Sequence, residues 1–401
     1  MSELTRIGEN TSNLKRDTLD FVSRSWHCCH MLQPVMIELL GKSLQELRAF
    51  CITLGEPEYR GQQLYHAMYA ERKFAFADMT NLPSALRDRL TSQASITLPA
   101  ERQRYASRDG SVRYLYALPT GQQPAARPAS VEAVFMPSES RQTICISTQA
   151  GCAVDCQFCL TAQLGLIRNL TAGEILAQVL SPLKEHRLAA GGGSGVPHPI
   201  QTNVVLMGQG EPLLNFEAVM AALRILLDPA GVAISPKHAT LSTSGIVPGI
   251  ERLGQEAVRP KLAVSLNASN DEQRNALMPI NRKYPLKALL DACKNYPLRN
   301  WEHVTFEYVM LGGVNDTPED AGRVVRLLAP LKSVRVNLIP WNPGELPYRE
   351  SSAEAIEEFR RILGDRGIPA FVRYSRGRDV MAACGQLALR EVQSPGLTVI
   401  S

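Results

Sequence analysis

The sequence predicts an α/β fold, namely a partial (β/α)6 barrel that follows a small helical N-terminal domain. Two observations predict the barrel: six short β-rich runs occur from residue 143 onward, and helical stretches separate them. Strands that alternate with helices form a parallel sheet covered by helices. A third observation, the helical spacing of apolar residues within 37–97, predicts the N-terminal domain.

The predicted elements divide the chain into five segments. Residues 37–55 carry apolar residues at helical spacing, and Gly55 is a stop signal for that helix. Residues 109–121 alternate like a strand after an Asp-Gly turn, and residues 131–137 are also strand-like. The expected segments are a loose leader (1–36), a helical accessory domain (37–97), a β-rich connector (98–142), the partial barrel (143–390) and a tail (391–401).

The barrel strands matter because reactive groups in such folds lie in the loops after the C-terminal ends of the strands. The six runs are 143–148, 203–208, 238–244, 261–266, 304–311 and 334–340. The glycine-rich stretch 189–199 does not follow a strand in GxGxxG order. We therefore expect a flexible surface insertion there and not a phosphate-binding loop.

Composition narrows the class of protein. The 401 residues carry a net charge of +4, which permits a nucleic-acid partner without demanding one. No apolar run reaches the roughly 18 residues that span a bilayer, and the N-terminus lacks an apolar signal core. We expect a cytoplasmic protein with no membrane contact. Nine cysteines, an odd number in a long chain, do not resemble a secreted disulfide framework.

Three cysteines follow the first barrel strand in the spacing CxxxCxxC, at Cys152, Cys156 and Cys159. Soft thiolates select iron–sulfur clusters or zinc. Structural zinc sites close with four ligands, usually in two CxxC pairs, and the sequence has no second pair. A [4Fe–4S] cluster on three cysteines leaves one iron open to bind S-adenosylmethionine (SAM), as in radical SAM enzymes. A structural zinc site and three buried thiols without metal are the alternatives.

Motifs beyond the cysteines extend this interpretation over most of the chain. They include VLMGQGEPLLN, LSTSGIVPGI, AVSLNA, NLIPWNP and RGRDVMAACGQL between about residues 130 and 390. With these motifs the chain resembles the RlmN-type dual-specificity RNA methyltransferases, radical SAM enzymes that methylate C2 of adenine in 23S rRNA and in tRNA. The helical N-terminal unit also fits. Two positions depart from the pattern: Leu160 stands where Ser or Ala is common, and Asn267 where some members carry His.

The resemblance implies a reaction that uses two SAM molecules per turnover. Cys384 takes a methyl group from the first, and the 5′-deoxyadenosyl radical from the second removes a hydrogen from that S-methyl group. The methylene radical adds to adenine C2, and Glu132 accepts the C2 proton. Cys145 then attacks the Cys384 sulfur and leaves a transient Cys145–Cys384 disulfide. Because only a thiolate attacks well, we expect the site to lower the pKa of Cys145. Without the resemblance, Cys384 would be interpreted as a small buried cysteine, Cys145 as a core residue and Glu132 as a solvated strand residue.

Further residues are expected to hold the cofactor and the RNA. Polar groups at the strand ends, and their neighbours, are the expected SAM contacts: Gly210, Glu211, Ser242, Ser265, Leu266, Asn267 and Asn342. The candidate phosphate contacts are Arg168, Arg282, Lys283, Arg373, Arg376 and Arg378. The expected partners are 23S rRNA, tRNA and an electron donor such as a flavodoxin-type protein, and we expect a monomer.

Three other functions fit parts of the pattern. A Cfr-type enzyme, which methylates C8 of the same adenine, shares the cluster and both reactive cysteines, although Thr161-Ala162-Gln163 favours the C2 type. A non-catalytic RNA-binding module with a structural iron–sulfur cluster would bind RNA without cleaving SAM. A radical SAM enzyme that acts on protein or small molecules would cleave SAM without any effect of RNA.

Overall fold

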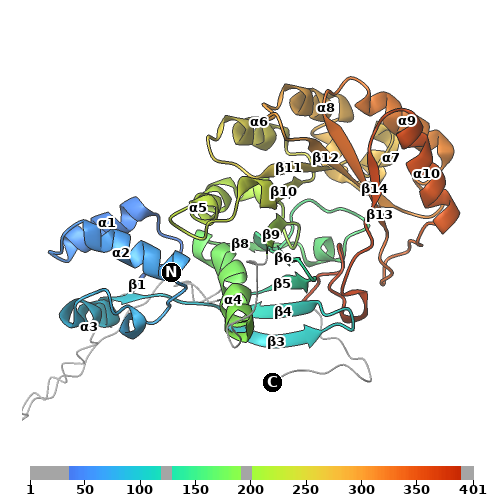
Figure 1. Cartoon of the computed structure of the whole chain (residues 1–401). Coiled ribbons are helices and arrows are strands. Elements are labelled where there is room, and N and C mark those ends of the chain that lie inside the picture. The colour runs from blue at the N-terminus through green and yellow to red at the C-terminus, as the bar shows by residue number, and fades with distance from the viewer. Residues whose placement is uncertain (1–35, 119–128, 191–200, 390–401) are drawn as a thin grey trace, which may run out of the picture. The chain divides into compact units, whose positions relative to one another are not determined.

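The computed structural model describes residues 36–118, 129–190 and 201–389 (Figure 1). The predicted leader apart from Met36, the tail, and nearly all of the predicted insertion at 189–199 lie outside the described residues. Among the described residues, no helix combines the length and apolar character needed to cross a bilayer.

One ten-stranded sheet organises the described chain, in the order β14-β13-β12-β11-β10-β9-β6-β5-β4-β3. The seven strands from β14 to β6 run parallel, and β6, β5, β4 and β3 pair antiparallel. The parallel strands are β6 (Arg141–Cys145), β9 (Gln201–Leu206), β10 (Ala239–Thr243), β11 (Lys261–Ser265), β12 (Val304–Met310), β13 (Val334–Pro340) and β14 (Ala370–Val372). The other three are β3 (Ala100–Ala106), β4 (Val112–Ala117) and β5 (Ser130–Pro137).

The six predicted barrel strands are therefore confirmed, and the sheet does not close on itself. The seventh parallel strand, β14, was not predicted because three residues are too short to show an alternating pattern. Strands β3 to β5, expected as a connector, continue the barrel sheet at its other edge.

Helices between the parallel strands cover one face of this sheet (Figure 1). They are α4 (Ala172–Ala190), α5 (Phe216–Leu227), α6 (Val247–Gln255), α7 (Asp271–Leu277), α8 (Leu286–Asn295), α9 (Pro318–Leu328) and α10 (Ala353–Asp365). Strand side chains alternate between the two faces. In β11, Leu262 and Val264 belong to the main hydrophobic core, whereas Ser265 faces a cavity on the other side of the sheet.

The N-terminal unit is helical, as predicted. It contains α1 (Leu44–Thr53), α2 (Tyr59–Tyr65), a π-helical turn (His66–Ala70) and α3 (Ser84–Gln93), with the short strands β1 (Ile37–Glu38) and β2 (Ala94–Ser95). Helix α1 begins at residue 44 and not at 37, because Ser43 and Glu46 form a capping box. Gly55, with φ +70°, follows its end.

The N-terminal unit contacts the start of α4 through two glycines. A Cβ atom on Gly41 would lie 2.4 Å from the backbone nitrogen of Gly173, and one on Gly173 would lie 2.4 Å from the carbonyl oxygen of Leu40. The Tyr69 hydroxyl accepts a hydrogen bond from the Gly41 N–H at 2.9 Å. Only glycine fits at both positions, so the two backbones touch directly.

Candidate active site

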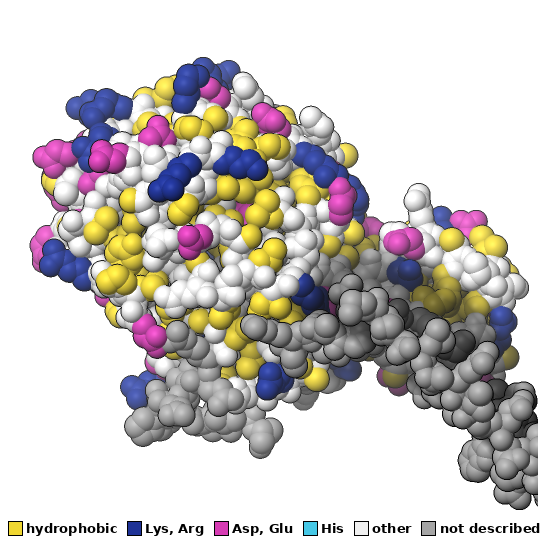
Figure 2. Space-filling view, turned by 180° about the vertical axis from the view of Figure 1, so that it is seen from behind, with side chains coloured by type: hydrophobic (Ala, Val, Ile, Leu, Met, Phe, Trp, Pro, Cys, Tyr) yellow, Lys and Arg dark blue, Asp and Glu magenta, His cyan; other side chains and the backbone are white. Residues whose placement is uncertain are grey.

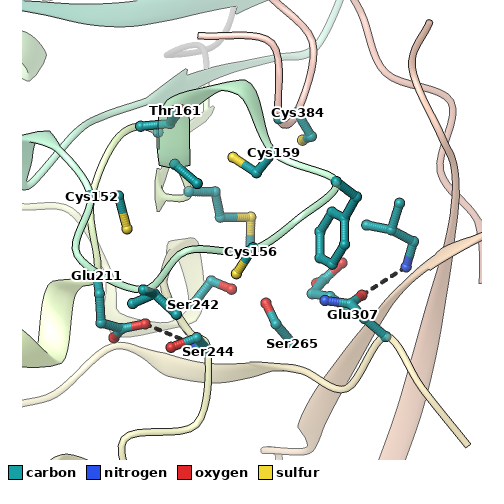
Figure 3. Close-up of a pocket in the computed structure, with 18 of the residues that line it drawn as sticks. Cys152, Cys156, Cys159, Thr161, Glu211, Ser242, Ser244, Ser265, Glu307 and Cys384 are labelled. Carbon is teal, nitrogen blue, oxygen red and sulfur yellow. Dashed lines mark hydrogen bonds between the residues drawn. The ribbon is translucent and has the colours of Figure 1, made fainter. Parts of the chain in front are cut away.

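A cavity of about 180 Å³ lies where the parallel strands end, between the cysteine loop and the C-terminal segment (Figure 3). Ten residues that the sequence predicted for cluster, SAM or methyl transfer line it. They are Cys152, Cys156, Cys159, Gly210, Glu211, Ser242, Ser265, Asn267, Asn342 and Cys384. The remaining three predicted residues, Glu132, Cys145 and Leu266, do not line the cavity.

The loop with the three cysteines is closed by a two-stranded hairpin, β7 (Gln149–Gly151) with β8 (Leu166–Asn169). Gly151 has φ +74°, and a Cβ there would lie 1.8 Å from the Gly165 carbonyl oxygen. The Cys152 N–H donates to that same oxygen at 3.0 Å, and the Cys159 N–H donates to the Cys156 carbonyl at 3.1 Å. The hairpin therefore turns the thiols into the cavity.

The donor set suits an iron–sulfur cluster. Figure 3 shows the Cys152, Cys156 and Cys159 sulfurs around one space. Among the described residues, no three Cys, His, Asp or Glu side chains form a group that could hold a single metal ion. A [4Fe–4S] cluster differs because each thiolate binds its own iron, which allows the ligands to stand further apart. Burial raises the pKa of Cys152 to about 11, so its thiol must release a proton when it binds metal.

Glu211 is a buried carboxylate whose orientation is fixed by the backbone. Its Oε1 accepts from the Leu213 N–H at 3.0 Å, and its Oε2 accepts from the Ser244 N–H at 2.6 Å. Burial raises the pKa of Glu211, and these hydrogen bonds oppose the rise. Gly210 before it has φ +96°, and a Cβ there would lie 2.5 Å from the Gln149 side chain. A pre-oriented carboxylate at the cavity can accept hydrogen bonds from an ammonium group.

Cys384 is carried by a segment that we call the C-terminal strap, residues 375–389. Asn342 Nδ2 donates to Ser375 Oγ at 2.9 Å and to the Cys384 carbonyl at 3.1 Å. The Leu160 N–H, next to the third cluster cysteine, donates to the Gly385 carbonyl at 2.8 Å. The strap thus holds the exposed Cys384 beside Cys159 (Figure 3). Desolvation at the cavity wall, together with the nearby Glu307 carboxylate, raises the pKa of the Cys384 thiol to about 11.

Cys145 lies behind the strap. It ends β6, is paired with Val134 in β5, and packs against Ala382 and Leu387 of the strap. Burial raises the pKa of its thiol, and the nearby Cys384 thiol adds to the rise. The prediction that the site lowers this pKa was wrong, because burial in an apolar cluster disfavours the charged thiolate.

Glu132 is fully buried in β5 under the strap. Its Oε1 lies 3.2 Å from Arg113 Nη1, and its Oε2 accepts from the Leu389 N–H at 3.0 Å and from Gln209 Nε2 at 3.2 Å. Burial raises its pKa, and Arg113 opposes that rise. Glu132 therefore holds the end of the strap in place through the hydrogen bond that it accepts from the Leu389 N–H.

Leu266, predicted as a SAM contact, is a core residue whose contacts stabilise the fold. Its side chain is fully buried in the main core, its N–H donates to the Glu307 carbonyl at 2.9 Å, and its own carbonyl accepts from Arg274 Nε at 3.1 Å.

Sequence reasoning missed two charged residues at the site. Arg274 is fully buried, and its Nη2 donates to the carbonyls of Ser244 and Ser265 at 2.7 and 3.0 Å, which joins the ends of two strands. Glu307 in β12 lines the cavity and accepts from Asn337 Nδ2 at 2.9 Å. The available signal for Glu307 was a carboxylate between two aromatic residues in the centre of a strand.

Comparisons with known proteins agree with this geometry. Residues 146–328 match the family model of the radical SAM superfamily, and residues 37–96 match that of the ribosomal RNA large subunit methyltransferase N-terminal domain. A probable dual-specificity RNA methyltransferase RlmN from Koribacter versatilis is 47% identical over 356 residues, which cover 84% of this chain and 98% of the relative. This chain belongs to the RlmN family of dual-specificity RNA methyltransferases.

Two further relatives support the same family. The RlmN of Geobacter sulfurreducens is 44% identical over 353 residues, covering 88% of this chain and 92% of the relative. The crystal structure of a radical SAM methyltransferase from Sphaerobacter thermophilus aligns with a TM-score of 0.80 and 41% identity, covering 87% of this chain and 98% of that one. The predicted family, fold class and enzyme class are confirmed, and the C8-type alternative is not favoured. Membership implies a [4Fe–4S] cluster and SAM.

Several arginines predicted to contact RNA in this RlmN-family enzyme already have partners in the chain. Arg168 Nη2 lies 2.6 Å from Glu174, and Arg378 Nη2 lies 3.0 Å from Glu350. Arg376 donates to the carbonyls of Pro137 and Asp109 and so ties the strap to the sheet. Their role in RNA binding stays a prediction.

Glu307 should give the stability of this RlmN-family enzyme a measurable pH dependence. Burial raises its pKa from 4.5 to about 7. Between these values the unfolded chain releases the proton that the folded chain keeps, so the free energy of unfolding should fall by about 3 kcal/mol as pH rises. Glu307→Gln should remove this dependence, and Glu357→Gln on the exposed face of α10 should not. Urea unfolding without oxygen between about pH 5 and 7.5 would measure it, and equal slopes for both variants would contradict it.

Proposed function

We propose that this enzyme methylates C2 of adenine in 23S rRNA and in tRNA, with Cys384 as the methyl carrier. The observation that carries the proposal is that Cys384 lines the same cavity as the three cluster cysteines. A methyl group on its sulfur would face the space where SAM is cleaved. Adenine C2 lies between two ring nitrogens and is electron-poor, so it cannot attack the methyl group of SAM directly.

The two functions of SAM would use different residues. The Cys384 thiolate takes the methyl group of one SAM molecule. Cys152, Cys156 and Cys159 would hold the cluster, which when bound would supply the electron for cleavage of a second SAM to a 5′-deoxyadenosyl radical. Glu211 would hold the ammonium group of SAM, and Ser242, Ser265 and Asn342 would hold its adenosyl part, because all four line the cavity. Two SAM molecules per turnover therefore belong to this proposal.

Cys145 and Glu132 would complete the reaction. After the methylene radical has added to C2, Glu132 would accept the C2 proton and the unpaired electron would return to the bound cluster. Cys145 would then attack the Cys384 sulfur and break its bond to carbon, and the released CH2 carbon would take up a proton to become the methyl group. Cys145 packs against residues of the strap on either side of Cys384, which supports this pairing. Neither Cys145 nor Glu132 lines the cavity, so the strap must shift during the reaction. The reaction requires an electron donor, such as a flavodoxin-type protein, and a reductant for the disulfide. We further propose that the enzyme is a cytoplasmic monomer.

The test is methylation of unmodified RNA. The protein would be purified without oxygen, loaded with its cluster, and incubated with SAM, reductant and a 23S rRNA fragment or tRNA transcript. We expect 2-methyladenosine by mass spectrometry of the digested RNA with wild type and with Cys293→Ala, a buried cysteine outside the cavity. Cys384→Ala should give none. Formation of 8-methyladenosine would move the enzyme to the C8 type, and 5′-deoxyadenosine without RNA methylation would make RNA the wrong substrate.

A further inference from the structure

The inner face of the barrel sheet is polar below the cavity. Strand side chains alternate, so the face that presents Ser265 at the cavity presents Lys261 four residues earlier. On β13 the same face presents Asn337 and Arg335 below Ile339. Closed barrels fill this space with bulky apolar side chains. Here the inward-facing side chains in the first half of the strands remain partly exposed: Asn203, Thr240, Lys261, Thr305, Arg335 and Asn337.

Three cations dominate this surface, which we call the basic inner face: Lys261 on β11, Arg335 on β13 and Arg373 just after β14. Lys261 is partly buried, and burial together with the charges of Arg335 and Arg373 lowers its pKa. The nearby Glu302 is itself paired with Arg299 at 2.8 Å. Within the described part of the chain, the side chains of Lys261 and Arg335 form no hydrogen bond or ion pair.

Two exposed arginines elsewhere on the protein have carboxylate partners, in contrast to the side chains of Lys261 and Arg335. Arg360 and Arg361 on α10 each pair with a carboxylate of their own helix, at 2.5 and 2.8 Å. On the face seen in Figure 2, basic side chains likewise stand among acidic and apolar ones. Like charges gathered without partners on a half-buried surface repel one another, and an anion bound there would relieve that repulsion.

The basic inner face is connected to the methyl carrier. Arg373 Nε donates to Asn337 Oδ1 at 3.3 Å, and Asn337 Nδ2 donates to Glu307, which lines the cavity with Cys384. Two residues after Arg373, Ser375 accepts from Asn342 at the cavity wall. A chain-like anion on these cations would thus lead toward Cys384.

Aromatic side chains accompany the cations on this edge. Tyr374 is 64% exposed and Phe371 is 45% exposed. The Arg373 guanidinium lies 5.9 Å from the centre of the Phe371 ring. Cations that follow a backbone, next to exposed aromatic rings on which bases stack, are the features that bind single-stranded nucleic acid.

We propose that the basic inner face binds the sugar–phosphate backbone of the RNA strand beside the target adenine, with Tyr374 as a stacking surface for a neighbouring base. The proposal rests on the proposed function, since the target base must leave its stack to reach Cys384. RNA is favoured over an acidic electron-donor protein because exposed aromatic rings, which bases can stack on, accompany the cations.

The test compares two double variants that each remove two positive charges, in the full-length, cluster-loaded enzyme. Lys261→Gln/Arg335→Gln should weaken binding of an unmodified tRNA transcript about tenfold or more. It should also reduce the slope of the logarithm of the RNA-binding constant against the logarithm of the salt concentration by about 1 to 2. Each lost phosphate contact removes about 0.7–0.9 from that slope. Arg360→Gln/Arg361→Gln should bind like wild type. Tyr374→Ala should weaken binding at least about fivefold, and Tyr374→Phe should not, because stacking needs only the ring.

The outcomes separate this inference from the proposed function. If wild type methylates RNA and the inner-face variant binds RNA as tightly as the α10 variant, the inference is wrong and the function stands. If wild type binds RNA but does not methylate it, the function fails while the comparison of variants remains valid. Unchanged RNA binding with slower reduction by flavodoxin, but not by dithionite, would assign the surface to the electron donor and overturn the inference.

Discussion

Cys156→Ala is expected to abolish both SAM cleavage and RNA methylation, with a loss of at least about a thousandfold, because two thiolates cannot retain a [4Fe–4S] cluster that needs three. Cys156 is the cluster cysteine that lies close enough to both other thiols for each to add to the rise that burial gives its pKa. Iron and sulfide per chain should fall with activity. Iron analysis, visible absorbance and release of 5′-deoxyadenosine would measure the effect.

Cys293→Ala is the matched control, because Cys293 is a buried cysteine on α8 that does not line the cavity. It should retain its iron and its activity. The circular dichroism spectrum of Cys156→Ala should match that of wild type, since its loop is held by backbone hydrogen bonds of the β7–β8 hairpin. Full iron content in Cys156→Ala would show that the cluster is held elsewhere.

Arg113→Met should destabilise the protein by about 3–5 kcal/mol, because it leaves the Glu132 carboxylate buried without its cation. Both side chains are almost completely inaccessible, at 1% and 0% exposure. Arg113 also donates to the Met381 carbonyl at 3.3 Å and so holds the strap that carries Cys384. Methylation should therefore be lost together with stability. Chemical denaturation and the methylation assay would measure the two effects.

The pH dependence of the stability loss in Arg113→Met, together with a double variant, would identify the cause of that loss. Without Arg113 the pKa of Glu132 rises further, so Glu132 takes up a proton in the folded state and the stability deficit should shrink as pH falls from about 8 to 5. Arg113→Met/Glu132→Leu should recover much of the stability but none of the methylation. A deficit that is independent of pH and survives in the double variant would indicate lost packing and not a buried charge.

The sequence predicted those features of the fold and the site that depend on a short, local pattern of residues. Cys152, Cys156 and Cys159 could be predicted as one site because their spacing confines them to one loop. The six strands could be predicted because each has an apolar run of sufficient length. Glu211 and Ser242 followed from their places after strands, where side chains of a parallel sheet converge.

Other features depend on contacts between distant segments. Arg274 is held by carbonyls at the ends of two neighbouring strands, and nothing in its own helix α7 indicates that. Cys145 lies beneath residues more than 230 positions later in the chain, so neither its burial nor the direction of its pKa shift could be derived locally. Lys261 and Arg335 each look like an ordinary surface cation until strand pairing places them on one face of one sheet.

The two glycines at the junction of the N-terminal unit and α4 limit how the protein can be recombined. A methyl group at either position would collide with the backbone of the other segment. Both positions must therefore be glycine, although they lie in different modules of the protein. A chimaera that takes its first 97 residues from a relative will join correctly only if that relative supplies glycine at position 41 and the recipient keeps Gly173. Exchange of the N-terminal module therefore requires one glycine from each parent, because the space between the two backbones has no room for a side chain.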